Sequence, residues 1–322
     1  MNGIPEIAPT GTTAEYLEPS ATQALPVGAK VDHIFRRNIE QPYVLQRLTE
    51  RVWWVSARNY TTLIYVGPDS VFVLDPLDNC YDRIVAAVRE ITDKPIGAIL
   101  YSHFHVDHIG DAGRFVEHDA DIRIIASAKT AAKLDAARSV LPRPNQVIDW
   151  PRGSFNYEGL HVELYGFEWA AHTEDHAAWL LPEERILHSP DLVNPDEPPF
   201  WRFAANERFL FTEDNLREVT QFDWDFFCGG HGNVGSRADI EFQLAFIAEL
   251  KQACVEEIAK IPRADFARPE RGSHTAWLAD YLAAVGEAAT ARLRPTYGGT
   301  YGFEVATRSN AEMIAFDFLQ YR

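Results

Sequence analysis

Four side chains of the kinds that bind metal ions fall within six consecutive residues, His103–His108, which read His-Phe-His-Val-Asp-His. The apolar residues 96–101 before this segment predict a buried strand. In an extended backbone His103 and His105 project to the same side, whereas the Asp-His pair lies past the bend and faces a second point. Imidazole and carboxylate groups together suit borderline ions such as zinc, so the segment predicts a two-metal site at a strand-to-helix turn.

A solvated loop or a chance cluster is the alternative interpretation, because the chain contains 11 histidines. With that composition, three histidines at these offsets arise in roughly one chain in a hundred. The aspartate in register and the preceding strand lower the chance further, and we prefer the metal site.

The pattern His-x-His-x-Asp-His after a hydrophobic strand resembles the signature of the metallo-β-lactamase fold superfamily, over roughly residues 48–250. The resemblance implies an α+β fold, an αβ/βα sandwich of two mixed β-sheets flanked by helices, with the metals at one edge between the sheets. The sequence pattern agrees, since short strands alternate with helices, as expected for two packed sheets with helices outside. Residues 141–157 are proline-rich and predict a loop.

The same resemblance implies a set of metal ligands. The first metal is assigned His103, His105 and His172, the second Asp107, His108 and His231, and Asp191 bridges both. Two departures concern the third histidine of the first metal, because the family's Gly-His-Thr element is Ala-His-Thr here and an aspartate precedes the competing His176. We expect His176 to support the ligands from behind. Asp75 either orients the ligand loop in the same way or caps the helix that follows.

Three regions are expected along the chain. Residues 1–45 lack a clear period and predict an extended arm, which is either a disordered tail or packs on its own body or on a second subunit, so a homodimer is possible. Residues 46–250 form the metallo-β-lactamase-like core. Residues 251–322 form a C-terminal helical cap, because residues 240–261 and 275–293 show helical patterns and an amphipathic segment ends the chain.

The composition limits which binding partners and which cellular compartment we expect. The net charge of −17, from 47 acidic and 30 basic residues, disfavours binding to nucleic acid, whose backbone is also negative. The chain has three cysteines and no Cys-x-x-Cys motif. We therefore expect no disulfide framework and a reducing compartment for Cys80, Cys228 and Cys254. No signal peptide and no membrane-spanning stretch are evident. We expect a cytoplasmic enzyme that acts on a small molecule.

The predicted chemistry is hydrolysis by a hydroxide that bridges two divalent ions, with zinc expected and iron or manganese as alternatives. Asp107 is the expected proton acceptor beside that hydroxide. The substrate is expected to be a carbonyl ester, with a lactone preferred and a β-lactam or thioester as related choices. Three aromatic residues are candidates for the substrate wall, Tyr60, Phe104 and Trp201.

Three other classes of function are compatible with parts of the sequence pattern. A mononuclear iron sulfur dioxygenase of the same fold would use fewer ligands than this chain offers. Hydrolysis of a sulfate or phosphate ester is compatible with the metal chemistry. A metal-binding sensor without turnover is disfavoured, because no ligand of the expected set is missing.

Overall fold

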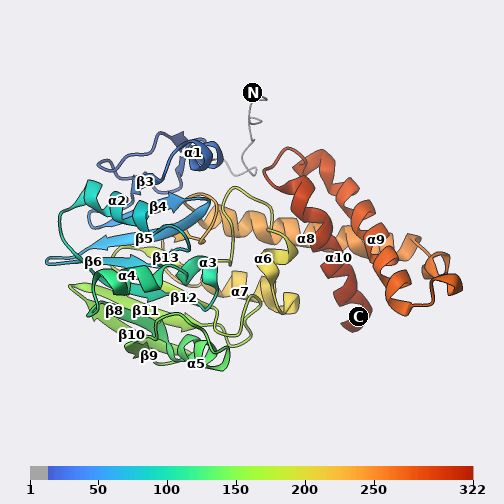
Figure 1. Cartoon of the computed structure of the whole chain (residues 1–322). Coiled ribbons are helices and arrows are strands. Elements are labelled where there is room, and N and C mark those ends of the chain that lie inside the picture. The colour runs from blue at the N-terminus through green and yellow to red at the C-terminus, as the bar shows by residue number, and fades with distance from the viewer. Residues whose placement is uncertain (1–13, 322) are drawn as a thin grey trace.

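Alternating side chains in the central strands give the larger sheet two buried faces. In β4 (Val52–Ala57), Val52 and Trp54 pack into the apolar core between the two sheets, whereas Trp53 and Val55 pack into a second core beneath the outer helices. Successive residues of a strand point to opposite faces, so a strand whose residues are all buried is covered on both sides. The computed structural model, which describes residues 14–321, shows this layered arrangement (Figure 1).

The larger sheet has seven strands in chain order, antiparallel from β3 to β6 and parallel from β6 to β9. Its strands are β3 (Val44–Arg47), β4, β5 (Tyr60–Val66), β6 (Val71–Leu74), β7 (Ile96–Tyr101), β8 (Arg123–Ser127) and β9 (Gln146–Ile148).

The smaller sheet has five strands, antiparallel except for the last pair, which is parallel. Its strands are β10 (Arg152–Tyr157), β11 (Leu160–Gly166), β12 (Ala177–Leu181), β13 (Ile186–His188) and β14 (Phe226–Cys228).

Helices cover the outer faces of both sheets, which confirms the expected sandwich. The seven-stranded sheet is covered through Ile84, Phe115 and Leu134, which lie on α2 (Tyr81–Ile91), α4 (Ala112–His118) and α5 (Ala128–Ala136). The five-stranded sheet is covered through Leu216 and Phe246, which lie on α7 (Thr212–Val219) and α8 (Arg237–Lys260). Short elements near the site are α3 (Val106–Ile109), α6 (Arg202–Ala205) and the 3-10 turn η1 (Phe209–Phe211).

The C-terminal part is helical, as expected, and continues directly from the core. α8 packs with α9 (His274–Tyr297) and α10 (Phe303–Tyr321), which lie side by side at the right of Figure 1, after the short turns η2 (Arg263–Phe266) and η3 (Pro269–Arg271). The expected division at 250–251 falls inside α8, because this helix contacts both the sheet and the terminal helices. α8 also starts earlier than residue 240, since Ser236 and Asp239 form a capping box there.

The described part of the N-terminal arm packs on the body of the protein. It contains β1 (Tyr16–Leu17), β2 (Lys30–Val31) and α1 (Ile34–Glu40), and it runs into the sheet through β3, so the expected boundary at 45–46 falls within a strand. Residues 1–13, which belong to the expected arm, lie outside the described residues.

The loop predicted for residues 141–157 is wrong from residue 146 onward, where the structure contains β9 and β10. β10 carries only two buried side chains, Phe155 and Tyr157, and it is an edge strand. Its remaining residues are exposed or partly exposed, so no clear hydrophobic alternation marks it in the sequence. Within residues 14–321, no helix combines the length and the apolar character that crossing a membrane requires.

Candidate metal centre

The histidine-rich segment lies where β7 ends, near the middle of the larger sheet. His103 and His105 lie in the turn after the strand, and Asp107 and His108 belong to α3. Asp75 follows the neighbouring strand β6, and its Oδ1 accepts a hydrogen bond of 2.7 Å from the backbone N–H of Ser102. This bond fixes the start of the turn, so that the histidines leave the sheet in a defined direction.

The other three residues of the expected ligand set lie in segments that adjoin strands of the smaller sheet. His172 lies between β11 and β12, Asp191 follows β13 and His231 follows β14. β13 and β14 pair in parallel, and the backbone N–H of Asp191 donates to the carbonyl of Gly229, 2.9 Å away. The strand pairing therefore brings two segments that are distant in sequence to the same edge as the segment after β7.

Gly230 allows this approach. Its φ is +79°, and a Cβ at this position would lie 2.5 Å from Cε1 of His108 and 2.7 Å from Cβ of Pro190. A side chain would thus clash with the candidate ligand while straining the backbone.

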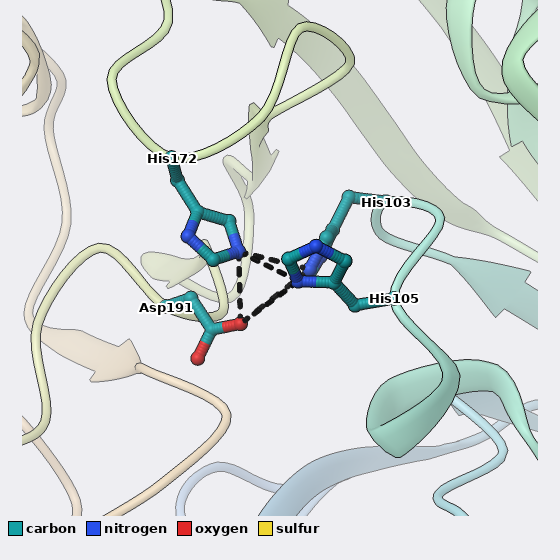
Figure 2. A group of neighbouring side chains, drawn as sticks. All are labelled: His103, His105, His172 and Asp191. Carbon is teal, nitrogen blue, oxygen red and sulfur yellow. Dashed lines mark hydrogen bonds and ion pairs between the residues drawn. The ribbon is translucent and has the colours of Figure 1, made fainter. Parts of the chain in front are cut away.

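The first ligand group gathers three imidazoles and one carboxylate (Figure 2). Nε2 of His172 lies 3.3 Å from Nε2 of His103 and 3.0 Å from Nδ1 of His105. Oδ2 of Asp191 lies 3.1 Å from Nε2 of His172 and 3.4 Å from Nε2 of His103. The four ligand atoms all lie within 4.8 Å of one another.

The second ligand group shares Asp191 with the first and adds Asp107, His108 and His231. Asp191 reaches Nε2 of His108 through Oδ2 at 3.2 Å and Nε2 of His231 through Oδ1 at 3.2 Å. Oδ2 of Asp107 lies 3.5 Å from the same nitrogen of each histidine. The structure thus brings together all seven residues of the expected ligand set.

These distances fit two cations. In a tetrahedral zinc site with bonds of about 2.0–2.1 Å, neighbouring ligand atoms lie about 3.3–3.4 Å apart, which matches most of the separations in both groups. The three nitrogens of the first group face one another in addition to the carboxylate, an arrangement that hydrogen bonds alone satisfy poorly. A cation between them would satisfy all four atoms.

The electrostatics also favour bound cations. Burial lowers the pKa of His103 well below its usual value, which keeps this imidazole neutral as a metal requires. Burial opposes ionisation of Asp191, but His108 and His172 outweigh it and hold its pKa well below the usual range. Burial would also lower the pKa of His231, yet Asp107 and Asp191 raise it to about 10. The carboxylates therefore create a strong local demand for positive charge.

His176 and His188 lie next to the centre but outside both ligand groups. Nε2 of His176 donates to the carbonyl of Pro190 at 2.8 Å, and burial, with His172 nearby, lowers its pKa to about 3. It therefore supports the turn that carries Asp191. Nε2 of His188 donates to Oδ2 of Asp75 at 2.9 Å, so Asp75 is held between this histidine and the ligand turn.

A cavity of about 450 Å³ opens over the centre. Its wall includes four of the candidate ligands, His105, Asp107, Asp191 and His231. The other lining residues are Phe35, Arg58, Asn59, Tyr60, Asn194, Glu197, Phe200, Ala204, Ala205 and Tyr301.

Of the three aromatic residues expected in the wall, Tyr60 lines this cavity and Phe104 and Trp201 do not. The Phe104 ring packs beneath the ammonium group of Lys133, 4.1 Å from its centroid. Trp201 is 48% exposed, and its neighbour Phe200 contributes to the wall instead. At residues 200–201 the sequence identified the aromatic segment but not which side chain turns inward.

The sequence analysis missed the contributions of the two chain ends to the wall. Phe35 lies on α1, and Tyr301 lies in the turn between α9 and α10. Phe35 is one of several apolar residues spread over positions 31–45, which favour packing of the arm, and nothing in the sequence near Tyr301 indicates a cavity.

A two-sheet sandwich with two adjoining ligand groups at one edge defines a class of metal-binding protein. Residues 57–286 match the family model described as the metallo-beta-lactamase superfamily, and the chain belongs to that superfamily. The family and the ligand groups together imply bound divalent metal ions.

Individual proteins are similar to parts of the chain. The chain is 27% identical to 2,4-dinitroanisole O-demethylase subunit alpha of Nocardioides sp. over 207 residues, 59% of this chain and 58% of that protein. It is 28% identical to a hydroxyacylglutathione hydrolase of Prochlorococcus marinus over 122 residues, 38% of this chain and 44% of that protein. The chain thus spans less than two thirds of either relative.

Among solved structures, the metallo-beta-lactamase from Pontibacter korlensis has a similar fold, with a TM-score of 0.54 and 17% identity. The match covers 63% of this chain and 97% of that protein. At this identity the likeness concerns the fold alone.

Proposed function

We propose that this chain is a hydrolase that uses two divalent ions, preferably zinc, to cleave a carbonyl ester of a small molecule, with a lactone as the preferred substrate. The observation that carries the proposal is the pair of ligand groups that share Asp191 at the base of a cavity of about 450 Å³. Members of the superfamily are mostly hydrolytic enzymes, which supports the reaction class.

The proposed ligand roles follow the two groups described above. His103, His105 and His172 would hold one ion, Asp107, His108 and His231 the other, and Asp191 both. When bound, two divalent ions supply Lewis acidity toward a carbonyl oxygen and lower the pKa of water to about 7. The chain's own residues then have to position the ester and transfer a proton from the attacking water to the leaving oxygen.

Asp107 is suited to carry out this proton transfer. Burial opposes its ionisation, but His231 and His108 outweigh burial and lower the pKa of the carboxyl below its usual value. The carboxylate is partly exposed to the cavity, so it can accept the proton of the attacking water and pass it to the leaving oxygen. Tyr60 lies in the same wall, and burial, followed by Asp107, raises the pKa of its phenol, which therefore stays a neutral hydrogen-bond donor.

An Asp107→Asn variant is expected to lower kcat by about 10²–10³, because the amide cannot accept the proton. The side chain is 35% exposed, so the fold should be retained. Steady-state kinetics and circular dichroism check both statements, with Asp82→Asn, a surface aspartate paired with Arg114, as the matched control. Near-normal turnover by the Asp107 variant would end its proposed role.

The substrate class is tested by a panel offered to the zinc-loaded protein. It contains lactones, a β-lactam, a thioester, a sulfate ester and a phosphate ester, and it includes 2,4-dinitroanisole because of the relative named above. Lactones are expected to give the highest kcat/KM, with activity lost on chelation and restored by zinc. Preferential cleavage of the sulfate ester or of dinitroanisole would replace the ester proposal. Activity that depends on iron and consumes oxygen would instead support the sulfur dioxygenase alternative.

A further inference from the structure

Two aromatic residues of the cavity wall come from segments near the two ends of the chain. The Phe35 ring on α1 and the Tyr301 ring before α10 stack with centroids 4.0 Å apart and an interplanar angle of 13°. Both rings line the cavity and both are partly buried. The pair therefore contributes aromatic surface to the cavity that adjoins the metal centre.

The arm that carries Phe35 is anchored to the loops of the site. Lys30 is completely buried, and its Nζ lies 2.7 Å from Oδ1 of Asp239 and 3.0 Å from Oδ1 of Asp196. The side chain of Asn233 accepts a bond of 3.0 Å from the backbone N–H of Val31 and donates one of 2.8 Å to its carbonyl. Since Asp196 and Asn233 belong to the segments that follow Asp191 and His231, the position of the arm is fixed relative to the ligands.

The C-terminal helix α10 holds a further segment that lines the cavity. Asn310, buried on α10, accepts from the backbone N–H of Phe203 at 2.9 Å and donates to the carbonyl of Pro199 at 2.6 Å. These bonds fix the left-handed turn α6, whose residues Ala204 and Ala205 line the cavity. The small side chains of these two residues take up little of the cavity.

A carboxyl group also lies in the cavity wall, close to the turn that carries Tyr301. Glu197 lines the cavity, and its Oε2 would lie 3.9 Å from a Cβ placed on Gly302, the residue after Tyr301. Burial raises the pKa of Glu197 to about 8. A neutral ring of a substrate would gain the contact with the aromatic pair.

We propose that Phe35 and Tyr301 form a specificity subsite for a neutral planar group, such as an aryl ring, attached beside the scissile bond of the substrate. This proposal deepens the hydrolase proposal and names the substrate class of the same site. It assigns a role in substrate selection to both chain ends.

The test compares two lactones that share the scissile bond, γ-phenyl-γ-butyrolactone and γ-methyl-γ-butyrolactone, on the zinc-loaded full chain. The phenyl compound is expected to have the higher kcat/KM. Phe35→Leu and Tyr301→Leu, which keep apolar volume, should each lower the phenyl-to-methyl ratio about threefold to tenfold, the range expected for one aromatic contact. Tyr301→Phe should keep the wild-type ratio. The control is Phe316→Ala, which removes an exposed ring of α10 that does not line this cavity.

A second readout separates this proposal from the hydrolase proposal. The corresponding γ-phenyl and γ-methyl γ-lactams, which resist hydrolysis, are titrated calorimetrically into the same zinc-loaded proteins. Tighter binding of the phenyl lactam, lost in both leucine variants, supports the subsite even if no lactone is cleaved, and in that case the ester proposal fails alone. A phenyl-to-methyl preference that is absent in the wild type, or unchanged in both leucine variants, overturns the subsite even if lactones are cleaved.

Discussion

Replacement of Asp191 by asparagine is expected to lower kcat/KM by more than about 10³. In the structure its Oδ2 faces His103, His108 and His172, and its Oδ1 faces His231, so one carboxylate serves both ligand groups. An amide lacks the negative charge and cannot bind through two equivalent oxygens. Weakened Lewis-acid stabilisation worth several kcal/mol corresponds to a loss of this size.

Metal analysis provides the measurement that distinguishes this effect from misfolding. The wild type, loaded with zinc and freed of excess metal, is expected to retain two ions per chain, and the Asp191→Asn variant fewer than two. Asp149→Asn, at an exposed position, is the matched control and should match the wild type in metal content and turnover. A variant at position 191 that keeps both ions and full activity would contradict the bridging role.

The local part of the centre could be predicted from the sequence because its ligands are neighbours in the chain. One strand and one turn deliver His103, His105, Asp107 and His108, and both are visible as an apolar run followed by a histidine-rich segment. His172, Asp191 and His231 could be proposed only through the family resemblance. What brings the last two together is the parallel pairing of β13 with β14, which no local pattern encodes.

The substrate wall was harder to predict, for two physical reasons. Consecutive aromatic residues in irregular segments follow no fixed period, so the sequence did not distinguish Phe200, which lines the cavity, from Trp201, which does not. Contacts between the chain ends, such as the Phe35–Tyr301 stack, depend on the whole intervening fold. The arm was expected as either a tail or a packed segment, and the buried Lys30 explains why its described part is packed.

A Lys30→Met variant is expected to lose about 3–5 kcal/mol of unfolding free energy, because it leaves two buried carboxylates without their cation. Burial favours the neutral amine, but Asp239 and Asp196 outweigh it and raise the lysine pKa above its usual value, so the ammonium group is charged at neutral pH. Both carboxylate partners are also nearly fully buried, which limits solvent screening. Urea unfolding of the zinc-loaded chain measures the change.

Two further variants make this prediction specific. Lys260→Met removes a lysine that is 58% exposed and paired with Glu257 on the surface of α8, and it should cost less than about 1 kcal/mol. Adding Asp239→Asn to Lys30→Met removes one of the two buried carboxylates that lack a cation. The double variant should therefore regain part of the lost unfolding free energy. Because the arm carries Phe35, folded Lys30→Met protein should also show a reduced preference for the phenyl lactone. A loss below about 1 kcal/mol at position 30 would mean that the arm is held by its backbone contacts with Asn233 rather than by the buried charges.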